Sequence, residues 1–174
     1  MAYGCVAPSA RFFGPSVHRG PGNRRSIALT FDDGPSEGTL PLLETLSRLS
    51  VSATFFQCGA NVRRLPHIAR QVAASGHELG NHSDTHPWMV LRTPGFIDRE
   101  FSAAQNTIVN ETGVTPKLLR APYGLRWPMW SMQTGSLEPR ALSARSTRFL
   151  RWIPSVMGAF ITARCSGCVN RLRP

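Results

Sequence analysis

The 174-residue sequence has few acidic residues, few cysteines and no long apolar run. Its apolar runs are far too short to cross a membrane, so we expect no membrane span. Met1 to Gly22 lack the uninterrupted apolar centre of a secretory signal, so we expect no export signal there, and the compartment stays open. The four cysteines, including the pair Cys165 and Cys168, have neither the number nor the spacing of a disulfide framework or a zinc ribbon. With 41% hydrophobic and 17% charged residues, the composition argues against global disorder.

The shortage of acids leaves a net charge of +10, which at first suggests a polyanion partner. The basic excess lies mainly in residues 129–174, which hold seven arginines and one acid. Without interleaved aromatic motifs this is weak evidence for nucleic-acid binding, so we expect no nucleic-acid partner. We therefore divide the chain into an irregular lead-in (1–25), a catalytic-type domain (26–128) and a basic tail of unclear structure (129–174).

Apolar patterning in the middle of the chain alternates between strand and helix periods. The predicted strands and helices, in chain order, are Ser26–Phe31, Thr39–Leu49, Val51–Cys58, a helix from Pro66 to about Gly76, Glu78–Asn81, Ile97–Thr112 and Leu118–Arg120. Such alternation predicts parallel β-α units and an α/β fold. A later apolar segment, 149–160, fits either a strand pair or a short helix.

Chemically active residue types follow three of these strands. Asp32 and Asp33 follow the first, His82 and His86 follow the third at the i, i+4 spacing of a helix face, and Arg120 ends the fourth. In parallel α/β folds the carboxyl ends of the strands share one edge, so we expect these groups to converge. Taken alone, each motif has an ordinary explanation, such as a turn, a chance histidine pair or an exposed arginine.

One carboxylate and two imidazoles form a metal site that keeps an open position for water. A bound metal lowers the pKa of that water from near 16 towards ~7, and a second carboxylate is then free to act as a base. Successive strand side chains diverge, so one of Asp32 and Asp33 is the ligand and the other the base. Arg120 would orient the base, and backbone N–H groups of the turn at 122–124 would hold an oxyanion. The pattern predicts metal-assisted hydrolysis of an acyl bond.

Three segments, 30–35 (TFDDGP), 76–87 (GHELGNHSDTHP) and 120–124 (RAPYG), closely resemble the motifs of the polysaccharide deacetylases. This is the NodB-homology group, or carbohydrate esterase family four. The resemblance implies an incomplete, distorted (β/α) barrel that lacks its last strands here. It also implies a hydrolase that removes N-acetyl groups from chitin-like or peptidoglycan sugars, or O-acetyl groups from xylan.

The resemblance also assigns roles to individual residues. It implies that Asp32 is the base, that Asp33, His82 and His86 bind the metal, that Arg120 supports the base and that Tyr123 contributes a backbone oxyanion donor. The metal is expected to be zinc, with cobalt and nickel as alternatives.

The chain departs from the family pattern after about residue 128. Two later family motifs, an Asp-Trp segment and a Leu-x-His whose histidine protonates the leaving amine, are missing, since no histidine follows His86 and no aspartate follows Asp98. Our hypothesis is a truncated or frame-shifted product. Two alternatives to an active enzyme stay open: a remnant that binds metal or sugar without turnover, and a basic polyanion-binding protein.

Overall fold

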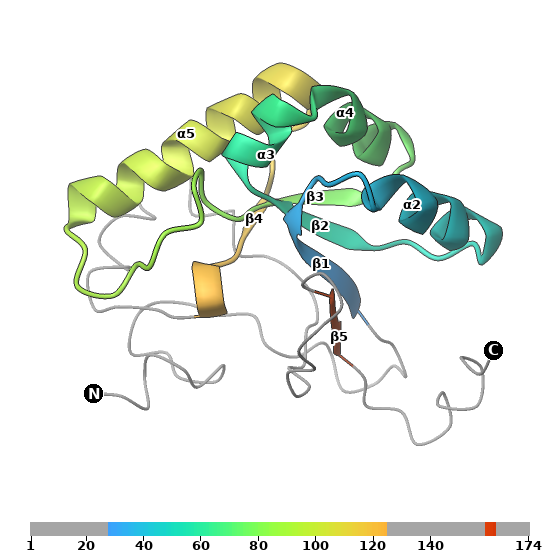
Figure 1. The fold of residues 1–174 in the computed structure, drawn as a ribbon, viewed down its shortest axis with the longest axis horizontal. Helices are drawn as coiled ribbons and strands as arrows, with labels where there is room; N and C mark the ends of the chain where they lie inside the picture. Colours follow the sequence, from blue (N-terminus) through green and yellow to red (C-terminus); the bar gives the residue numbers. More distant parts are fainter. Residues whose placement is uncertain (1–27, 125–158, 163–174) are drawn as a thin grey trace.

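The computed structural model describes residues 28–124 and the backbone of residues 159–162, and these form one five-stranded sheet (Figure 1). The strand order is β4-β3-β2-β1-β5. The first four strands run parallel, and β5 pairs antiparallel with β1. The strands are β1 (Ala28–Gly34), β2 (Thr54–Gln57), β3 (Glu78–Asn81), β4 (Leu118–Leu119) and β5 (Ala159–Thr162).

The helices gather on one face of this sheet (Figure 1). They are α2 (Thr39–Arg48), α3 (Gly59–Arg64), α4 (Pro66–Ala74) and α5 (Pro94–Thr112), and a 3₁₀ turn, η1 (Pro122–Gly124), follows β4. The predicted α/β fold of successive β-α units is confirmed, and the open sheet is that of an incomplete barrel.

A buried apolar cluster joins this sheet to its helices. Phe55 of β2 and Leu79 of β3 pack against side chains of all four helices, including Leu43, Leu46 and Ile108. Because the helices are amphipathic and the strands are parallel, this packing covers one face of the sheet and leaves its carboxyl-terminal edge free for polar residues.

Several predicted boundaries were wrong. The first strand continues through Asp32 and Asp33 to Gly34, so both acids lie within the strand. Leu49 was predicted as the last core residue of the helix Thr39–Leu49. Because α2 ends at Arg48, Leu49 lies outside the helix and is 53% exposed. The last long helix begins at Pro94, since proline is well suited to a first helical turn.

The short helix α3 was not predicted. Its six residues, GANVRR, carry one large buried apolar side chain, Val62, and therefore no helical period. It forms because its first amides bind a neighbouring loop: Gly59 N–H donates to the Ser83 carbonyl (3.1 Å) and Ala60 N–H to the Asp84 carbonyl (2.9 Å). This is a tertiary effect that local patterning does not reveal.

The lead-in (1–25) and most of the basic tail (129–174) lie outside the described residues, and the proposed domain boundaries stay predictions. The exception is β5, at the end of the apolar segment 149–160. Cys58 is a buried free thiol, whereas Cys165 and Cys168 lie outside the described part. Within the described part, no helix combines the length and apolar character that a membrane crossing needs.

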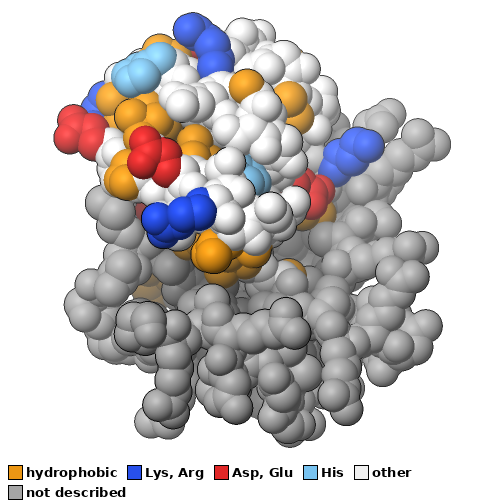
Figure 2. Space-filling model, turned by 90° about the vertical axis from the view of Figure 1, so that its right-hand side faces the viewer, with side chains coloured by type: hydrophobic (Ala, Val, Ile, Leu, Met, Phe, Trp, Pro, Cys, Tyr) orange, Lys and Arg blue, Asp and Glu red, His pale blue; other side chains and the backbone are white. Residues whose placement is uncertain are grey.

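The surface of the described part carries charges of both signs. On the face drawn in Figure 2, basic and acidic side chains are interspersed with hydrophobic and other residues. This face of the described region therefore offers no continuous basic patch to a polyanion.

Candidate functional site

The end of β1 places its two aspartates in different surroundings. Asp33 has a φ of 64°, in the left-handed region, and the β1–β2 register shifts between Phe31 and Gly34. This irregularity turns the two side chains apart, as expected for successive positions. The Asp32 side chain is 5% exposed and that of Asp33 is 55% exposed.

Asp33 and the two histidines converge at the carboxyl edge of the sheet. Asp33 Oδ1 lies 3.3 Å from His82 Nε2 and 3.1 Å from His86 Nε2. All three candidate ligand atoms lie within 4.8 Å of one another. Among the described residues this is the group of ionisable side chains suited to hold a metal ion.

The hydrogen bonding of His82 fits a metal ligand. Its Nδ1 lies 2.9 Å from the Arg120 carbonyl oxygen, which can only accept, so Nδ1 carries a proton. In neutral His82, Nε2 is then an acceptor that faces the acceptor Asp33 Oδ1, and a cation or a further proton must lie between them. A carbonyl partner on the second ring nitrogen is typical of metal-binding histidines.

The spacing of the donor atoms also fits an ion. A tetrahedral ion with ligand distances of 2.0–2.2 Å separates neighbouring ligand atoms by roughly 3.3–3.6 Å. The two measured separations from Asp33 are close to that range. Two imidazoles and one carboxylate suit zinc, and they also accept cobalt or nickel.

The two histidines do not lie on a helix, so the interpretation of their i, i+4 spacing was wrong. They stand at the two ends of a loop in which Ser83 and His86 have φ values of 68° and 55°. The loop reverses direction and brings the ring centroids to 4.9 Å from each other. A hydrogen bond from His82 N–H to the Gln57 carbonyl (3.0 Å) fixes where the loop leaves the sheet.

The pKa shifts suit a metal-binding group. Its hydrogen bond with His82 lowers the pKa of Asp33 below the usual value, so this carboxylate is ionised at neutral pH. Burial lowers the pKa of His86, which favours the neutral imidazole that a metal needs. Asp33 and His86 are thus in ligand-competent protonation states at neutral pH.

Asp32 is held by Arg120. Arg120 Nη1 donates to Asp32 Oδ1 (2.6 Å) and to Thr30 Oγ1 (3.0 Å), and its guanidinium lies 4.1 Å from the centroid of the Phe56 ring. Burial raises the pKa of Asp32, whereas Arg120 and His82 act to lower it. A buried carboxylate of raised pKa, fixed in one orientation, is suited to accept a proton.

Tyr123 lies beside the metal-type cluster. It sits in η1 with a φ of 57° and is 59% exposed. Its ring centroid is 4.7 Å from that of His86 and 5.3 Å from that of Trp88. Its role as a backbone oxyanion donor stays a prediction. The exposed Trp88 was missed by sequence reasoning, although its position two residues after His86 is a usable signal.

The remaining histidines of the described part lie elsewhere. His77 precedes β3 and packs against Phe55, with ring centroids 5.3 Å apart, as expected for a structural histidine. His67 is exposed on α4, also as expected. His18 lies outside the described residues.

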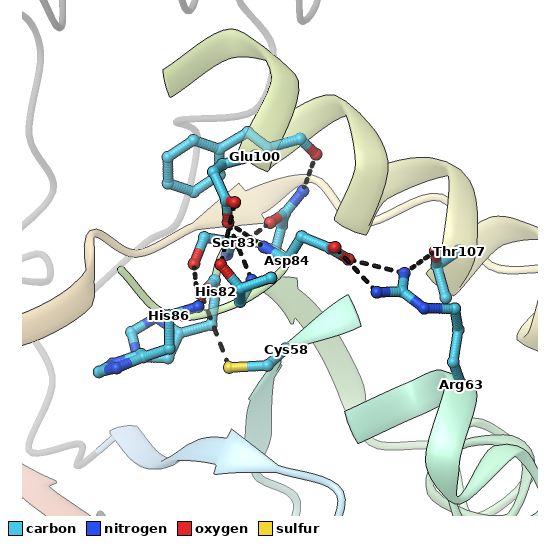
Figure 3. Close-up of polar contacts among 11 residues, drawn as sticks. Cys58, Arg63, His82, Ser83, Asp84, His86, Glu100 and Thr107 are labelled. Carbon is cyan, nitrogen blue, oxygen red and sulfur yellow. Dashed lines mark hydrogen bonds and ion pairs between the residues drawn. The ribbon is translucent and has the colours of Figure 1, made fainter. Parts of the chain in front are cut away.

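Sequence reasoning also missed the polar layer behind the loop, drawn in Figure 3. It includes Arg63 of α3 and Glu100 of α5, which contact the loop from positions far away in the sequence. No local motif marks these residues, because their roles depend on how the helices pack.

Comparison with known proteins agrees with this geometry. Residues 19–133 match the family model described as polysaccharide deacetylase. A peptidoglycan-N-acetylglucosamine deacetylase from Bacillus cereus is 44% identical over 104 residues, covering 59% of this chain and 38% of that protein. A chitooligosaccharide deacetylase from a Bradyrhizobium species is 39% identical over 103 residues, covering 58% of this chain and 47% of that protein.

Solved structures give the same result. A crystal structure of a peptidoglycan N-acetylglucosamine deacetylase superimposes with a TM-score of 0.65 at 32% identity, covering 68% of this chain and 56% of that one. A family-four pseudoenzyme from Bacillus anthracis also has a TM-score of 0.65, at 26% identity, covering 70% of this chain and 43% of that one.

The chain thus spans less than half of the length of these two curated relatives and about half of the two solved chains. The family model nevertheless covers most of the sequence, including every residue of the candidate site. The three predicted motifs lie within the matched region and meet at one edge of the sheet. The chain belongs to the polysaccharide deacetylase family.

Proposed function

We propose that the chain is a metal-dependent hydrolase that removes acetyl groups from N-acetylated glycans, such as peptidoglycan or chitin oligomers. The observation that carries this proposal is the convergence of Asp33, His82 and His86 beside a buried Asp32 that is fixed by Arg120. The substrates named for the relatives, peptidoglycan N-acetylglucosamine and chitooligosaccharide, support the choice of glycan.

Each residue has a defined part in this proposal. Asp33, His82 and His86 would hold a divalent ion, zinc by preference, which when bound polarises the acetyl carbonyl and acidifies water. Asp32 would accept the proton of the attacking water, and Arg120 would keep its carboxylate aimed and desolvated. The backbone N–H of Tyr123 would stabilise the negative charge that develops on the acetyl oxygen.

The reaction adds water to the acetyl carbon and breaks the C–N bond, releasing acetate and an amine. The amine must leave with a proton, which a general acid supplies. Loss of a general acid typically slows such a step by ~10²–10⁴. Acetyl esters would suffer less, because an alkoxide leaves more readily than an amide anion.

A second candidate is a protein that binds metal and glycan without turnover. The similarity to a structure described as a family-four pseudoenzyme supports this candidate. The two candidates share the metal site and differ only in catalysis.

Acetate release and metal binding together distinguish the candidates. The full chain, loaded with zinc, is incubated with N-acetylglucosamine oligomers, with peptidoglycan and with an acetylated xylan, and acetate is measured. Release that stops with a chelator and with Asp33→Ala supports the hydrolase. One bound equivalent of zinc without acetate release supports the binding protein, and failure to bind zinc refutes both.

A further inference from the structure

The segment that joins the two candidate ligands, residues 82–86 and hereafter the histidine loop, has an unfavourable backbone. Ser83 and His86 both have positive φ values although neither is glycine. Residues other than glycine adopt this region rarely, and they persist there only where neighbouring groups hold them. The separation of His82 and His86 therefore depends on whatever holds the loop.

The backbone amides of this loop donate hydrogen bonds to side-chain oxygens, whereas those of a strand or helix donate to backbone carbonyls. Four consecutive amides each donate to a side-chain oxygen, and two of the four reach the same carboxylate. The pairs are Ser83 N–H to Asn81 Oδ1 (3.0 Å), Asp84 N–H and Thr85 N–H to Glu100 Oε2 (3.1 and 2.8 Å), and His86 N–H to Ser83 Oγ (3.2 Å).

Among these side-chain acceptors, Glu100 is the one that lies on a helix, and it accepts two of the four contacts. Its second oxygen, Oε1, also accepts from the Thr85 hydroxyl at 3.0 Å, so that one carboxylate accepts three hydrogen bonds from the loop. The helix itself is anchored, since Ile97 and Phe101 on either side of Glu100 are buried. A rigid element thus supports the middle of the loop.

A second contact restrains the same turn from the opposite side. Asp84 forms a two-pronged ion pair with Arg63 of α3, at 2.7 and 2.8 Å, and Arg63 also donates to Thr107 of α5 at 3.0 Å (Figure 3). A Cβ at Gly59 would overlap Asp84 Oδ1, so the start of α3 is pressed against this pair. The carboxylate of Asp84 is therefore engaged by Arg63, and the acceptor for the amides of Asp84 and Thr85 is Glu100.

We propose that Glu100 is a positioning residue for the metal centre. By holding the amides of Asp84 and Thr85, its carboxylate fixes His86 at the separation from His82 that a metal ion requires. Glu100 is not in the candidate ligand group, and its effect passes through the loop backbone. This inference rests on the proposed metal site and names a residue that no motif of the sequence marks.

The test compares Glu100→Ala with Glu100→Gln in the full chain. Alanine removes both acceptor oxygens and with them all three hydrogen bonds, so zinc affinity measured by calorimetry should fall ~10- to 100-fold, the usual effect of losing an outer partner of a ligand. Glutamine keeps an acceptor oxygen but loses the charge, so it should stay within about threefold of wild type, as expected for an effect of positioning. The visible absorption of bound Co²⁺ should broaden or weaken in Glu100→Ala only.

Glu111→Ala is the matched control. Glu111 lies on the same helix and pairs with Arg70 at 2.7 Å, so its loss removes an ion pair between α4 and α5 without touching the loop. It should leave zinc affinity unchanged. Equal losses in Glu100→Ala and Glu111→Ala would mean that α5 packing alone matters, and the proposal would be wrong.

Hydrogen exchange in metal-free protein separates this proposal from the proposed function. The amides of Asp84 and Thr85 should be protected in wild type and exchange at least tenfold faster in Glu100→Ala. If wild type binds no zinc or cobalt, the metal site is refuted while exchange still decides the role of Glu100. Unchanged exchange, or glutamine as damaging as alanine, overturns the positioning role.

Discussion

Arg120 Nη1 donates to Asp32 Oδ1 at 2.6 Å, and this partly buried ion pair joins residues that are 88 positions apart in the chain. The same arginine offers its backbone carbonyl to His82 Nδ1 at 2.9 Å. One residue thus orients both the candidate base and a candidate metal ligand. Substitutions of the Arg120 side chain should consequently affect proton transfer and stability together, while they retain the backbone carbonyl that His82 contacts.

Asp32→Asn should reduce any acetate release by ~10²–10⁴, because the base is lost, while zinc affinity stays within about twofold. Asp33→Asn is the informative comparison, since it removes a candidate ligand and should weaken zinc binding as well. Acetate assays paired with calorimetry measure both effects. Equal loss of zinc binding in the two variants would contradict the assignment of Asp32 as base and Asp33 as ligand.

Arg120→Met should lower the free energy of unfolding by about 3 kcal/mol at pH 7, because it leaves Asp32 buried without its partner. Burial already raises the pKa of Asp32, and loss of the guanidinium should raise it further. The folded variant then binds a proton more tightly than the unfolded chain, so its stability deficit should shrink as the pH falls towards 5. Denaturant unfolding at pH 7 and pH 5 measures this, and Asp32→Asn combined with Arg120→Met should be milder than Arg120→Met alone.

Cys58 should resist alkylation in the folded protein. It is buried at the end of β2, and burial together with nearby carboxylates raises its pKa to about 12. At pH 8 almost no thiolate exists, so iodoacetamide should label the Cys58 peptide at least a hundredfold more slowly in the native state than in denaturant. Peptide mapping by mass spectrometry gives the rate for this residue alone. Fast native labelling would contradict the packing at the end of β2.

His77 should make the protein less stable in mild acid. Burial lowers its pKa in the folded state, so the unfolded chain binds the proton more readily below its ordinary pKa of about 6.5. The stabilisation from keeping His77 neutral is complete above that pH and declines as the pH falls. Between pH 7.5 and 5.5, wild type should lose more stability than His77→Phe, which keeps the packing on Phe55. The exposed His67→Gln should behave like wild type, and identical pH profiles for wild type and His77→Phe would refute this origin.

Gly80→Ala should destabilise the protein by about 1–3 kcal/mol, the usual range for overpacking. A Cβ at Gly80 would overlap the ring of Phe56, which also stacks under the Arg120 guanidinium. Gly95→Ala is a mild control, because the nearest group there is the flexible end of the Arg99 side chain at 3.5 Å. Chemical denaturation measures both variants. Recovery of stability when Phe56→Leu is added to Gly80→Ala would identify the ring as the cause.

The sequence predicted the sheet and the ligand-type residues better than their surroundings. The strand Glu78–Asn81 agrees with the structure at both ends, because it is confined between the turn glycine Gly76 and the histidine motif that begins at His82. The convergence of Asp33 with His82 and His86 followed from parallel topology alone. The geometry of the loop between the histidines could not be predicted, since i, i+4 spacing is compatible both with a helix and with a turn that has positive φ angles.

The residues that support the histidine loop could not be predicted from the sequence, for a different reason. Glu100 and Arg63 belong to helices whose apolar periods say only which face is buried. Their polar contacts depend on how α3 and α5 pack on each other and on the loop, and this is a property of the assembled layers. The antiparallel pairing of β5 with β1 was equally hidden, because the segment 149–160 fitted either a strand pair or a helix.

The three donor atoms of the candidate centre come from β1 and from both ends of the loop after β3, and His82 is braced by the residue after β4. An unfolded chain does not bring these groups together, so an ion that binds there binds the folded state almost exclusively. By mass action, free metal at 100 times its dissociation constant would add ~2.7 kcal/mol to the free energy of unfolding. The midpoint of thermal unfolding would then rise with metal concentration, which makes metal supply a determinant of how much of this chain is folded.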